Sequence, residues 1–163
     1  MNERTLKILE YDRILQLLAN EASSNLGMEL AKKLKPSAVP ELVKERQEET
    51  AEALAILWRE GEIPLGGIRD IRESLKRAKL GVSLEPTELL AVCDVARAAR
   101  VLKKFLREKG AQVLLPYIAQ LASFPEIEEQ VARAIGPEGE VLDRASSKLS
   151  SLRAQIRTLQ NRL

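Results

Sequence analysis

The hydrophobic positions of this chain follow helical spacing along almost its whole length. Apolar residues recur at intervals of three and four, and the breaks between them fall at glycine, proline and serine. Ser23 and Ser24 are N-cap candidates, Pro40 suits a first helical turn, and Gly61 suits a helix end. The pattern predicts helices at residues 5–9, 11–21, 24–34, 40–60, 68–81, 86–106, 113–122 and 125–134. We therefore expect an all-α fold with a multi-helix core.

Two of these helices carry more specific expectations. From Leu89 to Leu106 the pattern is apolar on most sides, which is typical of a helix at the centre of a core. The helix over 40–60 has a densely charged first half, which we expect to face solvent. Its second half carries Leu54, Leu57 and Trp58, and we expect it to be docked against other elements.

Residues 136–142 give the only strand-like signal in the sequence. Two glycines and a proline stand between Ile135 and the pair Val141-Leu142. This arrangement predicts a small hairpin or an extended connection.

The last segment has the most regular pattern. Its apolar residues alternate at spacings of three and four without a gap, as in a coiled-coil heptad. They are Leu142, Ala145, Leu149, Leu152, Ile156, Leu159 and Leu163. We predict a helical core over 1–141, and over 142–163 the start of a long coiled-coil helix that is truncated at its C-terminus. Leu149, Leu152, Ile156 and Leu159, here called the apolar seam, would pack against another helix.

Charge divides the chain unequally. The whole chain carries a net charge of +2, whereas residues 142–163 contain one acid and five basic residues. The basic residues are Arg144, Lys148, Arg153, Arg157 and Arg162. Two interpretations stay open for this basic tail: an arm that contacts a nucleic acid, or the solvated flank of a coiled coil.

A second basic cluster ends the helix over 86–106. It consists of Arg100, Lys103, Lys104, Arg107 and Lys109. These charges either complement the helix dipole or form a patch that faces phosphate.

Composition removes several kinds of site. The chain has no histidine and one cysteine, which excludes histidine-based triads, imidazole zinc sites and an internal disulfide. We expect Cys93 to be a small buried hydrophobic residue. Gly66-Gly67 lacks the spacing of a phosphate-binding loop, and the glutamates at 45, 48, 49 and 52 are expected on a solvated helix face. We therefore expect no catalytic, cofactor-binding or metal-ligating residue in this chain.

No stretch is apolar enough to cross a bilayer, and the first residues do not form a signal region. We expect a cytoplasmic location and no membrane partner.

Short motifs in a fixed order point to a known family. The most specific are Pro64-Leu65-Gly66-Gly67-Ile68 and Gly139-Glu140-Val141-Leu142-Asp143. Others are Leu9-Glu10-Tyr11-Asp12, Leu26-Gly27, Glu49-Thr50-Ala51-Glu52-Ala53-Leu54, Leu84-Glu85-Pro86 and Arg144-Ala145-Ser146. Taken together, the chain resembles the N-terminal part of bacterial type-two MutS proteins. These are MutS paralogues that lack the mismatch-reading domain and carry a C-terminal Smr nuclease domain.

The resemblance implies a helical core followed by the ascending half of a lever, the long helix that carries the clamp in MutS-like proteins. The full-length protein would be a homodimeric ATPase and endonuclease that uses ATP and Mg²⁺. It would act on branched DNA, where it suppresses homologous recombination, or on collided ribosomes through ribosomal RNA. ATPase and nuclease motifs have no counterpart in this chain, so the resemblance implies a non-catalytic segment.

Two further interpretations concern a short motif and the apolar seam. Phe124-Pro125-Glu126 fits the mismatch-wedge pattern of true MutS proteins, but Pro125 suits a first helical turn here and we reject a wedge role. The alternative to the whole MutS interpretation is a stand-alone coiled-coil adaptor that binds protein partners through the apolar seam.

Overall fold

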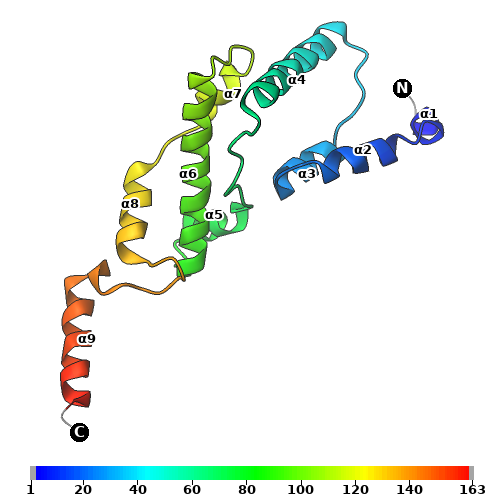
Figure 1. The fold of residues 1–163 in the computed structure, drawn as a ribbon. Coiled ribbons are helices and arrows are strands. Elements are labelled where there is room, and N and C mark those ends of the chain that lie inside the picture. Colours follow the sequence, from blue (N-terminus) through cyan, green and yellow to red (C-terminus); the bar gives the residue numbers. More distant parts are fainter. Residues whose placement is uncertain (1–2, 162–163) are drawn as a thin grey trace. The chain divides into compact units, whose positions relative to one another are not determined.

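The computed structural model describes residues 3–161, and within them the regular secondary structure is helical (Figure 1). The elements are α1 (Glu3–Ile8), α2 (Tyr11–Asn20), α3 (Asn25–Lys32), α4 (Pro40–Glu60), α5 (Arg72–Lys79), α6 (Pro86–Glu108), α7 (Leu115–Gln120), α8 (Pro125–Ala134), the 3-10 turn η1 (Asp143–Ala145) and α9 (Ser147–Gln160). The predicted all-α fold is confirmed. The helices predicted over 40–60 and 125–134 have those ends in the structure.

The chain divides into two compact units. Unit 1 comprises the residues through Asp70 together with Ala98–Ala122, and unit 2 comprises Ile71–Arg97 together with the residues from Ser123 onward. Helix α6 contributes its first half to unit 2 and its second half to unit 1. The predicted boundary between a core over 1–141 and a lever from 142 stays a prediction.

The core of unit 1 gathers around the second half of α6. Ile56 of α4, Leu106 of α6 and Ile118 of α7 are buried together with Ala111. Leu102 and Phe105 of α6 pack against this cluster. Removal of these side chains from water is the main favourable contribution to such packing. The prediction that the apolar α6 helix is central to a core is confirmed for this half.

Trp58 does not take part in this core, so the expectation that it is docked is wrong. Its side chain is 78% exposed, whereas Ile56 is 3% exposed. Two positions apart on a helix correspond to about 200° of rotation, so the two side chains point to opposite faces. The side of α4 that turns Ile56 into the core therefore turns Trp58 into solvent.

The charged half of α4 is less solvated than predicted. The Glu52 carboxylate accepts hydrogen bonds from the backbone N–H groups of Gln112, Val113 and Leu114, at 2.7, 3.1 and 2.8 Å. The Tyr117 hydroxyl donates to Glu49 over 2.9 Å. Partial burial opposes the charged form of Glu52, but the three backbone N–H groups outweigh it and keep the pKa of this carboxyl below its usual value. Glu49 and Glu52, which were both predicted on a solvated face, thus bind α7 and the residues just before it.

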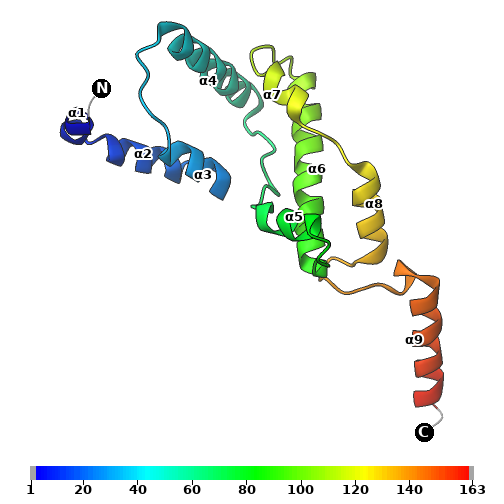
Figure 2. The same ribbon diagram turned by 180° about the vertical axis from the view of Figure 1, so that it is seen from behind.

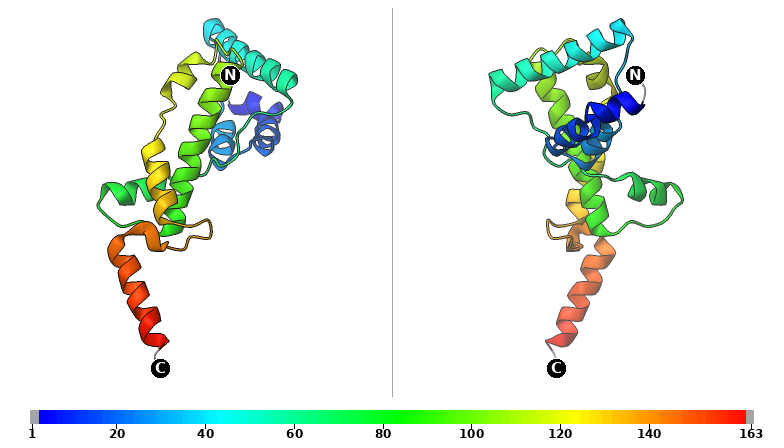
Figure 3. Two further views of the ribbon diagram at one scale, coloured as in Figure 1. Left: turned by 60° about the vertical axis from the view of Figure 1, so that its left-hand side comes forward. Right: turned by 90° about the vertical axis from the view of Figure 1, so that its right-hand side faces the viewer.

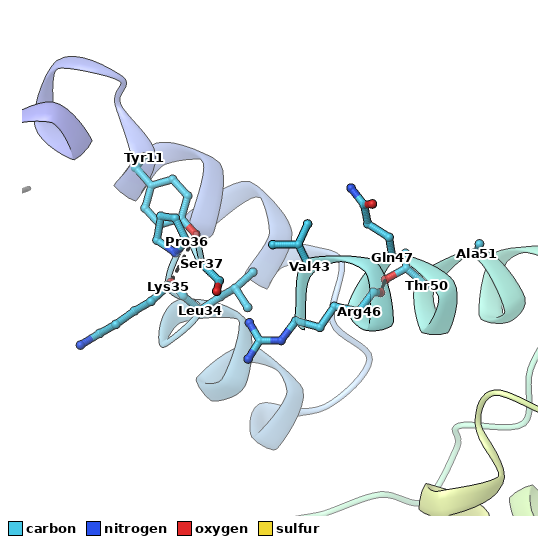
Figure 4. A pocket seen from close by; sticks show the side chains of 10 residues that line it. All are labelled: Tyr11, Leu34, Lys35, Pro36, Ser37, Val43, Arg46, Gln47, Thr50 and Ala51. Carbon is cyan, nitrogen blue, oxygen red and sulfur yellow. Dashed lines mark hydrogen bonds between the residues drawn. The ribbon is translucent and has the colours of Figure 1, made fainter. Parts of the chain in front are cut away.

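The first three helices form a hairpin-like group in unit 1, with α2 against α3. Ser24 has extended backbone angles, and its side chain accepts the Gly27 N–H at 3.1 Å, so the predicted N-cap is Ser24. The outward face of α2 leaves Leu17 more than half exposed. A hollow of about 450 Å³ lies between the residues that follow α3 and the first turns of α4, where the Tyr11 hydroxyl donates to the Leu34 carbonyl over 3.4 Å (Figure 4).

In unit 2, α8 lies beside the first half of α6 (Figures 1 and 2). Cys93 faces α8 and is 3% exposed, with its Sγ atom 3.8 Å from the Ile127 carbonyl oxygen. The prediction that Cys93 is a buried hydrophobic residue is confirmed. Burial raises the pKa of its thiol.

Helix α5 is joined to the start of α6 by Glu88. This carboxylate accepts the Glu85 backbone N–H at 2.9 Å, the Ser74 hydroxyl at 2.9 Å and the Arg77 guanidinium at 2.8 Å. The helix predicted over 68–81 is shorter in the structure, because Ile71 has non-helical backbone angles at the N-cap of α5.

The predicted hairpin between α8 and the last segment is confirmed. Ile135 and Val141 form an isolated antiparallel bridge, and the Gly136 N–H donates to the Glu140 carbonyl over 2.8 Å. Gly139 has a φ of 85°, which a residue with a side chain rarely adopts. This connection leads directly into η1.

The last helix does not begin at Leu142 as the heptad pattern predicted. Leu142 has extended backbone angles and Ala145 belongs to η1, so both lie outside α9. The physical reason is Ser146, whose backbone is extended and whose side chain accepts the Leu149 N–H at 3.1 Å. This N-cap starts a new helix at Ser147. Among residues 3–161, no helix is long and apolar enough to span a membrane.

Candidate nucleic-acid interface

The basic tail emerges from two elements of unit 2. Arg144 lies in η1, and Lys148, Arg153 and Arg157 lie in α9, whereas Arg162 falls outside the described residues. Lys148 is exposed in the first turn of α9. Each of the three described arginines donates a hydrogen bond to an oxygen of the protein.

Arg144 caps the end of α8. Its Nε atom donates to the Arg133 carbonyl over 3.0 Å, and its Nη2 atom donates to the Ala132 carbonyl over 3.1 Å. The last carbonyls of a helix have no partner within the helix and carry the negative end of its dipole. The Arg144 guanidinium donates to two of these carbonyls and places a positive charge at the negative end of the dipole.

Arg153 and Arg157 converge on Asp143. The Arg153 Nη1 atom lies 2.7 Å from Asp143 Oδ1 and also donates to the Val141 carbonyl over 2.8 Å. The Arg157 Nη2 atom lies 3.1 Å from Asp143 Oδ2. Hydrogen bonds from Arg153 and then Arg157 hold the pKa of the Asp143 carboxyl below its usual value. We call these three residues the Asp143 clasp, and it ties α9 to η1.

The apolar seam is uncovered in this chain. Leu152, Ile156 and Leu159 are 47%, 53% and 61% exposed, and Leu149, nearer the base of α9, is half-buried. Within the described part of unit 2, no other helix lies beside the C-terminal half of α9 (Figure 3). That this seam packs against another helix stays a prediction.

The second basic cluster, at the end of α6, is largely engaged in contacts within unit 1. Lys103 donates to the Leu121 carbonyl over 2.5 Å, and Lys109 lies 2.6 Å from Glu60. Lys104 pairs with Glu108 at 3.7 Å. These contacts favour the structural interpretation of the cluster over a phosphate-facing patch.

Sequence reasoning missed the acceptors of the basic residues. The carbonyls of Ala132 and Arg133 belong to every peptide chain and carry no sequence signal. Asp143 did offer one, because it is the sole acid among the basic residues of the last segment. Its spacing from Arg153 becomes meaningful only when η1 folds back toward α9.

Among residues 3–161, no group of three or more His, Cys, Asp or Glu side chains could hold a metal ion. The hollow shown in Figure 4 is lined by apolar groups, three hydroxyls, one amide and the basic residues Lys35 and Arg46. No carboxylate or imidazole that could act as a general base is among its lining residues. We therefore assign no catalytic role to it.

No family model matches this chain. It does match curated proteins named "Endonuclease MutS2" over its whole length. It is 42% identical to the protein of Bacillus cytotoxicus, 44% to that of a Geobacillus species and 39% to that of Bacillus cereus, each over 168 residues. The chain is similar to a MutS2 segment. It spans 21% of the length of these relatives.

The match with MutS2 supports the family resemblance drawn from the short motifs. The relatives are named as endonucleases, so the full-length relatives are enzymes. The apolar seam and the Asp143 clasp are therefore features of a segment similar to MutS2.

Proposed function

We propose that this chain is the N-terminal core and ascending lever segment of a MutS-like ATPase and endonuclease. In this proposal the segment is non-catalytic and transmits motion from the ATPase to the clamp. The observation that carries it is the uncovered apolar seam on α9, a helix whose base is tied to its own unit by arginines. Similarity to MutS2 over the whole chain supports it.

A lever needs stiffness along its length and at its base. An α-helix supplies the first, since every backbone hydrogen bond lies along the axis and each residue adds about 1.5 Å. Arg144 ties η1 to α8, and the Asp143 clasp ties α9 to η1. A rotation of α8 would therefore be passed on to α9 and become a larger displacement at the tip.

The complete protein would act on branched DNA, in suppression of homologous recombination, and on collided ribosomes, in ribosome rescue. We propose that it works as a homodimer in the cytoplasm, and that other parts of it bind ATP and Mg²⁺. Gly66-Gly67 forms a turn without the phosphate-binding spacing, so these two glycines do not make an ATP-binding loop. We derive no step through ATP from this segment.

The test substitutes three residues of the apolar seam in the complete protein. In the variant L152E/I156E/L159E the face that receives the returning lever helix becomes charged. We expect ATP hydrolysis to persist while its stimulation by branched DNA or ribosomes is lost. The matched control S151E/Q155E/T158E places the same charges about 100° around α9 from the seam and should keep the stimulation. Normal stimulation in the seam variant would show that α9 is not a lever.

A second candidate is the coiled-coil adaptor, which the uncovered seam also favours. It would bind a protein helix and no nucleic acid. Salt separates the two functions, because phosphate contacts weaken steeply as salt rises and an apolar seam is nearly indifferent to it. The gene downstream of Leu163 gives a further test: a Walker A motif and an Smr domain support the MutS-like proposal, and a stop codon supports the adaptor.

A further inference from the structure

The Asp143 clasp has the geometry of an occupied anion site. Its two guanidinium groups come from Arg153 and Arg157, which are one helical turn apart on the same face of α9. Each binds a different oxygen of a single carboxylate, at 2.7 and 3.1 Å. All three side chains are partly exposed, so that a ligand in solution can approach them.

A backbone phosphate offers the same pair of oxygens. The two non-bridging oxygens of a phosphodiester carry one negative charge, as the two oxygens of a carboxylate do. Guanidinium groups bind both kinds of oxyanion through parallel N–H donors. The arrangement that holds Asp143 is therefore also suited to a single phosphate of a nucleic acid.

We propose that Arg153 and Arg157 form a site for one backbone phosphate of a nucleic acid, and that the Asp143 carboxylate occupies this site until the phosphate replaces it. This inference rests on the proposed function, in which the complete protein binds nucleic acid. Asp143 acts as an internal competitor that lowers the affinity of the basic tail in the free protein.

Exchange is favoured over simple addition. A phosphate placed beside the Asp143 carboxylate would bring two negative charges together, which is unfavourable at this distance. When the phosphate displaces Asp143, Arg153 still donates to the Val141 carbonyl and Arg144 still caps α8. The base of α9 thus stays attached, while the direct link between Asp143 and the helix is released. Binding of nucleic acid would in this way loosen the junction between η1 and α9.

The experiment uses the complete protein and measures its affinity as a function of salt. The probes are a fluorescent four-way DNA junction and an RNA stem-loop with the same number of phosphates. The variants are D143N, R153Q/R157Q and the triple variant D143N/R153Q/R157Q. E138Q is the matched control, because it removes the same charge from an exposed position on the neighbouring hairpin. Circular dichroism melting confirms that each variant is folded.

We expect D143N to raise the affinity about 3- to 10-fold, because no carboxylate competes for the two arginines, and to leave the slope of log K against log salt nearly unchanged, because the same number of phosphates is bound in both proteins. E138Q should leave both nearly unchanged, and R153Q/R157Q should weaken binding and abolish the effect of D143N. A gain in one arm identifies DNA or RNA as the source of the phosphate.

Two results would overturn the exchange. If R153Q/R157Q weakens binding while D143N has no more effect than E138Q, the arginines contact nucleic acid but Asp143 does not compete. If neither Arg nor Asp substitutions change the affinity, the basic tail makes no contact at all. The seam variant described above tests the lever separately, so a failure of the clasp and a failure of the proposed function are distinguishable.

Discussion

The guanidinium of Arg144 lies 3.0 Å from the carbonyl oxygen of Arg133, at the last turn of α8. This contact joins two segments that are separated by the hairpin over 136–142. Arg144 belongs to the basic tail, for which the sequence suggests nucleic-acid binding. In the fold it also caps the C-terminal end of α8.

Replacing Arg144 by Gln should destabilise the chain. The substitution removes the charge that complements the C-terminal end of α8 and weakens two hydrogen bonds. We expect a loss of about 1 kcal/mol in the free energy of unfolding, which urea denaturation measures. R133Q removes an equal charge from the last turn of α8 without removing a hydrogen bond to its carbonyls, so it should cost less stability than R144Q. Equal stability of R144Q and wild type would contradict the capping role.

Replacing Glu52 by Gln should produce a pH-dependent loss of stability. Because the pKa of Glu52 is lowered in the folded chain, its charged form stabilises the fold above the usual pKa of 4.5. This stabilisation is lost as the pH falls through the lower pKa of the folded state. At pH 7 we expect E52Q to be about 1 kcal/mol less stable, which is the contribution of charged hydrogen bonds reduced for partial exposure.

Urea denaturation of wild type and E52Q at pH 7 and pH 3 checks this prediction. The difference between the two proteins should shrink at pH 3. Glu48→Gln, on the exposed side of α4, is the matched control and should show no such difference. If the difference in unfolding free energy between wild type and E52Q is the same at both pH values, the charge of Glu52 does not stabilise the fold.

Cys93 should react slowly with thiol reagents while the chain is folded. Its burial against α8 hinders access, and burial also raises the pKa of the thiol, which lowers the fraction of reactive thiolate. A colorimetric disulfide reagent at pH 8 should therefore label it at least 10-fold faster in guanidinium than in buffer. Since the chain has one cysteine, the signal is unambiguous. Fast labelling of the folded chain would show that this part of α6 is accessible.

The 163-residue chain should self-associate through the apolar seam. The exposed Leu152, Ile156 and Leu159 form an apolar stripe that a second α9 can cover. Sedimentation at increasing concentration should show dimers, and L152E/I156E should remain monomeric. A strict monomer of the unaltered chain at high concentration would contradict the prediction.

Reversing charge in the basic tail should reduce nucleic-acid binding by the complete protein. R153E/R157E/R162E places three acids where a phosphate would bind, so we expect the affinity for branched DNA or ribosomes to fall at least 10-fold. The same substitutions also set two of these acids against Asp143, and a melting curve is needed to separate binding from stability. Unchanged binding would show that the basic tail does not contact the nucleic acid.

Predictability from sequence differed between parts of the chain for physical reasons. The ends of α4 depend on Pro40 and Gly61, which act through their own backbone preferences, so they could be predicted. The burial of Cys93 follows from its apolar neighbours on one helix. The exposure of Trp58 could not be predicted, because it depends on which face of α4 meets α6 and α7. The break before α9 depends on Ser146, whose capping preference was overlooked beside an unbroken heptad pattern.

Local chemistry and periodicity, which act within a few residues, determined the all-α class, both ends of α4 and α8, the hairpin and the existence of the apolar seam. Tertiary structure decided which groups the charged side chains contact. Glu52 holds the start of α7 across 60 residues of sequence, and Asp143 binds two arginines that the heptad pattern placed on a free flank. Hydrogen bonds and ion pairs of this kind act over about 3 Å in space, and sequence spacing alone does not show which groups folding brings that close.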